Sequence, residues 1–131
     1  LFGLKTVWIG SKKIEVSDPS KTIIDLLDDP KLVGGITVIL DFFTEYKESE
    51  YYNFDLLVQY AYQMNNKAIF KRLGFIYETM FDANDDILSI LIENISTGIS
   101  EFDPTHPSKY NITKWGLKTS EFWKKKYDRK K

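Results

Sequence analysis

The stretch NKAIFKRLGFIYETM, residues 66–80, decides the fold class. Apolar side chains recur in it at helical spacing along one face, at Ile69, Leu73, Ile76 and Met80. This spacing predicts an amphipathic helix whose apolar stripe covers a core. Either Asn65 or Asn66 is expected to cap the first turn, because an asparagine side chain accepts hydrogen bonds from the free amides there. Gly74 lies inside this helix, where glycine destabilises a helix by about 1 kcal/mol relative to alanine. Its presence predicts that another backbone crosses closely at this point.

Four more helices are expected around this one. The first begins with Asp18 as its N-cap and Pro19 in its first turn, and ends before Pro30. The second follows a glycine pair and ends in a charged turn at residues 45–50. A third helix ends at residues 65–66, and a fifth begins at Asp82 or Asn84. Their apolar stripes are Ile23, Ile24 and Leu27; Ile36, Ile39, Leu40 and Phe43; Leu57, Tyr60, Ala61 and Met64; and Ile87, Leu88, Leu91 and Ile95.

Strand patterns lie towards both ends of the chain. Residues 6–9 and 12–16 are β-prone runs separated by Gly10-Ser11, which predicts a tight hairpin. Residues 111–117 alternate like a half-buried strand, after a long loop at 98–108. Residues 120–127 are expected to form either a short helix or a mobile tail. The fold class is therefore α+β: a small β-sheet formed by the N-terminal hairpin and a C-terminal strand, packed on a cluster of about five helices.

Composition limits the class of protein. At 131 residues, with 43% hydrophobic and 15% aromatic residues, residues 1–131 are expected to form one ordered domain. The sequence contains no run of eighteen apolar residues, the length that a membrane-spanning helix needs. Its first residues lack the charged, then apolar, then small order of a secretory signal. The start also lacks Met, so we expect an upstream part to be missing. The absence of cysteine excludes a disulfide framework and fits a reducing compartment, so a cytoplasmic location is expected.

Charge is unevenly distributed along the chain. Residues 113–131 hold eight bases against Glu121 and Asp128, a net charge of +6, whereas the rest of the chain carries −7. Such asymmetry is typical of a surface that meets a charged partner. A solvated basic tail at 119–131 that only keeps the protein soluble is the alternative. The oligomeric state is left open.

Candidate catalytic groups are few. His106 is the single histidine and lies in a loop, so it supports neither a catalytic triad nor a histidine metal site. Gly34-Gly35 precedes a helix and is more simply explained by a tight turn than by an anion site. Carboxylates are plentiful, and Glu15 with Lys13 could be drawn into a metal nuclease site, but solvated helix faces explain them better. The carboxylates that we considered are Asp18, Asp25, Asp28, Asp29, Asp41, Glu45 and Glu78. We predict that the chain has no catalytic residues, no cofactor and no metal ligands.

Two adjacent bases stand inside the apolar helix at 66–80. Neighbours on a helix point about a third of a turn apart, so one of Lys71 and Arg72 is expected to pair internally while the other faces outward. Asp25 or Glu78 is the expected partner of Arg72, and the structural ion pair that we predict is Asp25 with Arg72. The residues predicted to contact nucleic acid or a partner are Lys71, Lys114, Lys118, Lys124, Lys125, Lys126, Arg129, Lys130 and Lys131.

Several segments, in matching order from about residue 6 to 118, resemble one family. They are Val16–Pro30 with Gly34-Gly35, Lys71–Glu78, Gly98, Phe102-Asp103-Pro104 and Lys114-Trp115-Gly116-Leu117. Together they resemble the C-terminal domain of AbiEi-type antitoxins, the transcriptional regulators of viral defence systems. The lysine-rich end past Thr119 departs from that pattern.

The resemblance implies a function. In that family an N-terminal winged helix binds promoter DNA, and the C-terminal domain counteracts a nucleotidyltransferase-like toxin in type IV toxin–antitoxin (abortive infection) systems. The resemblance implies that this chain is a non-catalytic effector domain that contacts DNA weakly and without sequence specificity. It also implies that the chain counteracts its toxin functionally, without forming a stable complex with it. The alternatives are a metal-dependent, nuclease-like domain and a structural oligomerisation module. A nuclease should show converging carboxylates and cleavage that depends on divalent ions.

Overall fold

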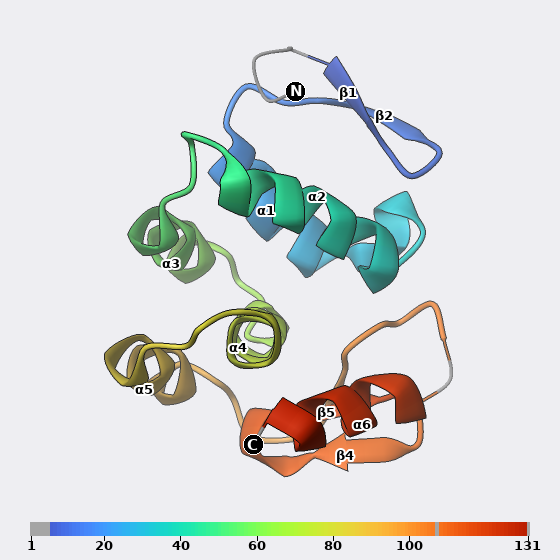
Figure 1. Cartoon of the computed structure of the whole chain (residues 1–131), viewed down its shortest axis with the longest axis vertical. Helices are drawn as coiled ribbons and strands as arrows, with labels where there is room; N and C mark the ends of the chain where they lie inside the picture. Colours follow the sequence, from blue (N-terminus) through green and yellow to red (C-terminus); the bar gives the residue numbers. More distant parts are fainter. Residues whose placement is uncertain (1–5, 107, 131) are drawn as a thin grey trace. The chain divides into compact units, whose positions relative to one another are not determined.

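The computed structural model describes residues 6–106 and 108–130. Within them the chain forms six α-helices, five short strands and two 3-10 turns, so the α+β class is confirmed (Figure 1). None of these helices combines the length and the apolar character needed to cross a membrane. The chain divides into two compact units, Leu1–Asn65 and Asn66–Lys131, which we describe one at a time. Whether the chain behaves as one domain in unfolding stays a prediction.

The elements follow one another in two groups. Unit 1 contains β1 (Thr6–Ile9), β2 (Lys12–Glu15), α1 (Pro19–Asp28), the 3-10 turn η1 (Pro30–Val33), α2 (Ile36–Glu48) and α3 (Phe54–Gln63). Unit 2 contains α4 (Ala68–Met80), α5 (Asp85–Glu93), β3 (Ser100–Glu101), β4 (Tyr110–Ile112), the 3-10 turn η2 (Thr113–Trp115), β5 (Leu117–Thr119) and α6 (Glu121–Lys130).

Unit 1 is built on α1, which packs against both α2 and α3. The expected cap is confirmed: the Asp18 carboxylate accepts hydrogen bonds from the backbone amides of Ser20 (3.1 Å) and Lys21 (3.3 Å). The stripes predicted for α1 and α2 are buried, but of the stripe predicted for α3 only Leu57 and Ala61 are buried, whereas Tyr60 and Met64 are partly exposed. Helix α2 runs to Glu48, past the start of the predicted charged turn. The helix continues because its buried stripe extends one turn further, to Tyr46, whose side chain is fully buried.

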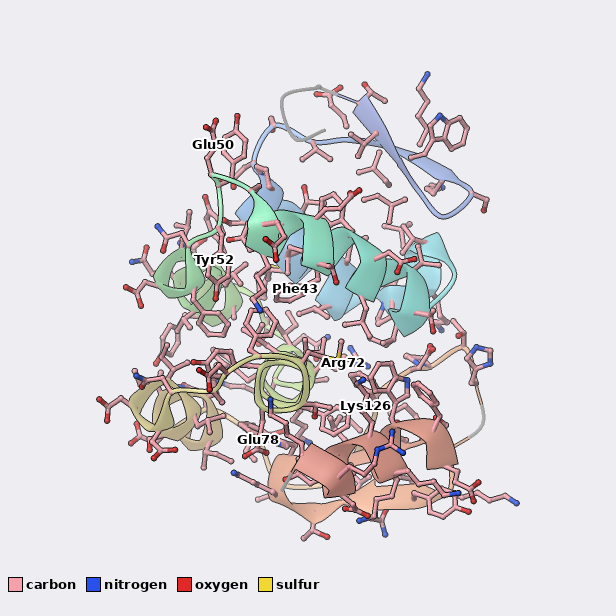
Figure 2. The ribbon with its side chains drawn as sticks, in the orientation of Figure 1. Phe43, Glu50, Tyr52, Arg72, Glu78 and Lys126 are labelled. Atoms are coloured by element: carbon pink, nitrogen blue, oxygen red, sulfur yellow. The ribbon has the colours of Figure 1, made fainter. Side chains whose placement is uncertain are left out.

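Tyr46 connects three parts of unit 1. Its hydroxyl lies 2.7 Å from the Ser20 hydroxyl on α1 and accepts a hydrogen bond from the Asn53 amide at 3.0 Å. Its ring makes edge-to-face contacts with Phe43 (6.0 Å between ring centroids) and Tyr52 (5.5 Å), which are labelled in Figure 2. These contacts fix the end of α2 and the segment leading into α3.

The glycine pair before α2 makes the tight turn that we expected. Gly34 and Gly35 have φ of 100° and 117°, a region that residues with a Cβ rarely adopt. The Gly35 amide donates to the Pro30 carbonyl at 2.9 Å and closes the turn after η1.

The strands form two separate sheets, so the prediction of one sheet shared by both ends is wrong for the described residues. The hairpin is confirmed, with β1 antiparallel to β2 and a positive φ of 62° at Gly10. The second sheet lies in unit 2 in the order β3-β5-β4, with β3 parallel and β4 antiparallel to β5.

The single strand predicted for residues 111–117 is also wrong. Gly116 adopts a left-handed conformation with φ of 63°, and the chain reverses through η2, so that Ile112 pairs with Leu117. The alternating pattern therefore covers two strands and the turn between them. The long loop expected at 98–108 contains the short strand β3.

Candidate nucleic-acid interface

Unit 2 is organised around the contact between α4 and Trp115. The N-cap position of α4 is Lys67, not Asn65 or Asn66 as predicted, although the Asn66 side chain accepts a hydrogen bond from the Ala68 amide at 3.0 Å. Trp115 is fully buried, and a Cβ atom at Gly74 would lie 2.1 Å from its ring. The close approach predicted at Gly74 is confirmed, but the neighbour is an indole side chain and not a backbone. Met80, expected on the buried stripe, is exposed at the end of the helix.

Lys71 and Arg72 are both buried, so the expectation that one of them faces outward is wrong. The Lys71 ammonium donates to the Gly98 carbonyl and to the Ser100 hydroxyl, both at 3.1 Å. The Arg72 guanidinium donates from Nε (3.1 Å) and Nη2 (3.0 Å) to the Glu101 carbonyl. Burial lowers the pKa of Lys71, and the neighbouring Arg72 charge lowers it further. Both bases therefore fasten the β3 segment to α4, and Lys71 does not belong to an exposed interface.

Asp25 belongs to unit 1 and Arg72 to unit 2. The ion pair that we predict between them stays a prediction. Asp25 is about half exposed on α1 and pairs with Lys21, one turn before it. Glu78, the other acid considered for Arg72, has partners on η2.

Glu78 is a carboxylate of α4 that bonds to two residues of η2. It accepts hydrogen bonds from the ammonium of Lys114 and from the indole Nε1 of Trp115 (2.9 Å). Burial works to raise the pKa of Glu78, but these donors outweigh it and hold the pKa below its usual range. The pKa of the Tyr127 hydroxyl is raised, first by burial and then by the Glu78 carboxylate. Glu78 thus links α4 to η2, through donors that favour its ionised form.

The segment expected to be either a short helix or a mobile tail is the helix α6, and one face of it packs inward. Trp123 contacts Phe102 with ring centroids 5.6 Å apart, and Tyr127 contacts Phe75 at 5.4 Å. On the same side, the Lys130 ammonium donates to the Phe81 carbonyl at 2.8 Å. In Figure 1, α6 lies along β4 and β5, and it contacts β4 and α4.

A face of α6 that flanks the packed one carries a second stripe, which we call the outward stripe and define as Phe122, Lys125, Lys126 and Arg129. These positions follow the spacing i, i+3, i+4 and i+7, which places them on one face of a helix. Phe122 is 62% exposed, and its ring packs edge-to-face against Trp123 at 5.1 Å. Figure 2 labels Lys126, which is partly exposed on this helix.

The bases of the C-terminal segment differ in whether a carboxylate already neutralises them. Lys114 pairs with Glu78, Lys124 with Asp128 at 2.9 Å, and Lys125 with Glu121 at 3.5 Å. Across the described residues, Lys126 and Arg129 make no ion pair with a carboxylate. Lys118 is partly exposed on β5, and Lys131 lies outside the described residues. The outward stripe therefore holds two cations that no described carboxylate neutralises.

His106 is the single histidine among the candidates for chemistry. His106 is exposed, and its Nε2 is 4.0 Å from the Asp103 carboxylate. Within residues 6–106 and 108–130, no three His, Asp or Glu side chains come together in a group that could hold a metal ion.

Sequence reasoning found the basic residues of α6 but missed two features. The spacing of Phe122 with Lys125, Lys126 and Arg129 is readable in the sequence and would have revealed the stripe, once the segment was taken as a helix. No sequence pattern reveals that Glu78 bonds to Lys114 and Trp115, because these two residues lie 36 and 37 positions after Glu78.

Comparison of the chain with known protein families, curated proteins and solved structures finds no match. The resemblance to AbiEi-type antitoxins therefore stays a prediction.

Proposed function

We propose that the chain is a non-catalytic effector module of an antitoxin-type regulator, and that the outward stripe of α6 makes weak, sequence-independent contacts with nucleic-acid phosphates. The observation that carries the contact proposal is the pair Lys126 and Arg129, two cations on one face of α6 without a carboxylate partner among the described residues. Lysine and arginine neutralise phosphates and release counterions, which drives non-specific binding.

The distribution of charge supports this assignment to unit 2. Residues 66–131 hold twelve bases and nine acids, a net charge of +3, whereas residues 1–65 hold six bases and ten acids, a net charge of −4. Phosphates are thus attracted to one unit and repelled by the other.

The buried face of α6 limits what the helix can read. Trp123 and Tyr127 are held by Phe102 and Phe75, so only one side of a ten-residue helix is free. Base edges are read from the major groove by a helix that enters it with several side chains. A stripe with two available cations suits phosphate contact, and sequence selectivity would come from another part of the regulator.

The antitoxin role rests on the resemblance, and the packing of unit 2 is compatible with it. Three of the segments that carry the resemblance meet there: Trp115 packs on Gly74, and Lys71 donates to Gly98. In this role the module works in the cytoplasm and counteracts a nucleotidyltransferase-like toxin without forming a stable complex with it. No three described His, Asp or Glu side chains gather in a group that could hold a metal ion, so the nuclease alternative receives no support from such a group.

Growth rescue tests the antitoxin role. A nucleotidyltransferase-like toxin of a type IV system is expressed with and without the chain, and colonies are counted. The proposal expects rescue of growth without a stable complex in a pull-down. Failure to rescue, with the module present at normal levels, would overturn the antitoxin role and leave the phosphate contact to be judged on its own.

A further inference from the structure

Unit 1 contains a cavity of about 240 Å³ between the hairpin and α2. Its lining comes from two elements: Trp8, Ile9 and Gly10 from the hairpin, and Val38, Asp41, Phe42 and Glu45 from α2.

The hairpin wall of this cavity is held close to the neighbouring backbone. A Cβ atom at Gly10 would lie 2.9 Å from the Val33 carbonyl oxygen and 2.9 Å from a methyl group of Val38. Ile9 and Val7, which alternate with Trp8 along β1, are buried. The position of Trp8 on the strand is therefore fixed by packing on both sides of it.

The cavity combines an aromatic surface with two carboxylates. Trp8 is 68% exposed, and the face of an indole attracts cations. Asp41 and Glu45 stand four residues apart on α2, so they share one face of the helix. Both are exposed, and neither carboxylate forms an ion pair or side-chain hydrogen bond with another described residue. Lys13, the cross-strand neighbour of Trp8, is not among the lining residues.

We propose that this cavity binds the side chain of an arginine from a basic segment of a partner protein. The guanidinium would stack on the Trp8 indole and bond to the carboxylates of Asp41 and Glu45. Arginine fits better than lysine because its planar group both stacks on an aromatic ring and bonds to carboxylates in a forked geometry. The site lies in unit 1 and is independent of the nucleic-acid contact proposed for α6.

The charge of unit 1 indicates a protein segment as the source of the cation. Residues 1–65 carry a net charge of −4, which steers a basic partner towards this unit. Exposed ion pairs and cation–π contacts are each weak, so a cavity of this kind holds one side chain of a longer segment better than a free small cation.

The test is a nuclear magnetic resonance titration of the ¹⁵N-labelled full chain with the blocked peptide Gly-Gly-Arg-Gly-Gly. The Trp8 indole signal is assigned as the one that the substitution Trp8→Phe removes. We expect this signal to shift and saturate with the arginine peptide, to shift less with a lysine peptide, and to stay in place with a glutamine peptide.

Variants of α2 complete the test. The substitutions Asp41→Asn and Glu45→Gln together should weaken binding about fivefold to tenfold, the loss expected from two exposed ion pairs. Glu48→Gln, on the same helix but outside the lining, is the matched control and should bind like the original chain. A Trp8 signal that never moves, that moves equally with the glutamine peptide, or that moves equally in the double variant and the original chain would overturn the proposal. Since both carboxylates are exposed, the double variant should have the same thermal midpoint as the original chain. The single variant Asp41→Asn is titrated in the same way as a second measurement of binding.

Discussion

The indole of Trp115 occupies the space beside Gly74, where a Cβ atom would lie 2.1 Å from the ring. Gly74→Ala should therefore destabilise the protein, even though alanine is the better helix former by about 1 kcal/mol. Overpacking of a filled core costs about 1–3 kcal/mol, and we expect a loss in this range in the free energy of unfolding, measured with urea.

A double-mutant cycle separates this clash from other effects at position 74. The ring atoms nearest to Gly74 belong to the six-membered ring of the indole. In the variant with both Gly74→Ala and Trp115→Phe, the smaller ring leaves room for the methyl group. The two losses should then sum to more than the loss of the double variant. Strict additivity would mean that Trp115 is not the neighbour that excludes alanine.

Glu78 should give the protein a stability that depends on acid pH. Its pKa in the folded state is held below the unfolded value of about 4.3. The stabilisation is therefore present above about pH 4.3 and disappears as the pH falls through the folded pKa. We expect Glu78→Gln to cost about 1–3 kcal/mol at pH 7 and progressively less towards pH 3, by urea unfolding at each pH. The exposed Glu50→Gln serves as the control, and an equal pH profile for the two variants would contradict the anchoring role of Glu78.

Arg72 should be needed for stability, in contrast to the exposed Arg129. Arg72→Ala removes two hydrogen bonds to the Glu101 carbonyl and leaves a buried acceptor without these donors. We expect a loss of about 2–3 kcal/mol in the free energy of unfolding. Arg129→Ala makes the same chemical change on the outward stripe and should stay within about 0.5 kcal/mol of the original chain. A thermal midpoint unchanged by Arg72→Ala would reassign Arg72 to a contact surface.

The isolated chain should cleave no nucleic acid. Labelled DNA and RNA are incubated with the chain in the presence of Mg²⁺ or Mn²⁺ and separated by electrophoresis. The expected result is intact substrate, since no three described His, Asp or Glu side chains gather in a group that could hold a metal ion. Cleavage that requires the divalent ion and is abolished by one carboxylate substitution would favour the nuclease alternative.

Local rules predicted most of the helical elements of this fold. The Asp18 cap, the Gly34-Gly35 turn and the stripe around Leu73 follow from hydrogen-bonding capacity, backbone freedom and the 3.6-residue period, all of which are readable along the chain. The hairpin was predictable for the same reason, because Gly10 and its flanking β-prone runs are adjacent in sequence.

Pairings between distant segments were not predictable in this way. Alternation at 111–117 does not reveal that Gly116 reverses the chain, since a turn preserves the alternating pattern on both sides. The joining of β3 to β5, the burial of Lys71 against Gly98 and the bonding of Glu78 to Trp115 all depend on tertiary packing. The error about Lys71 has the same origin: a lysine next to an apolar stripe was expected to face solvent, but carbonyl and hydroxyl acceptors reach it inside the unit.

The measurement that tests the central claim most directly is the salt dependence of DNA binding. Labelled duplexes of unrelated sequence are titrated with the full chain at several salt concentrations. The chain is compared with the variant Lys126→Ala/Arg129→Ala and with Lys12→Ala/Lys31→Ala, which removes the same charge from unit 1.

We predict weak binding to every duplex, with a dissociation constant on the order of 10⁻⁴ to 10⁻⁶ M at physiological salt. The slope of log affinity against log salt should be smaller by about 1.8 in the α6 variant, because two phosphates are no longer neutralised, and unchanged in the unit 1 variant. Equal slopes for the two variants, or tight binding to one sequence that survives high salt and the removal of both α6 cations, would contradict this prediction.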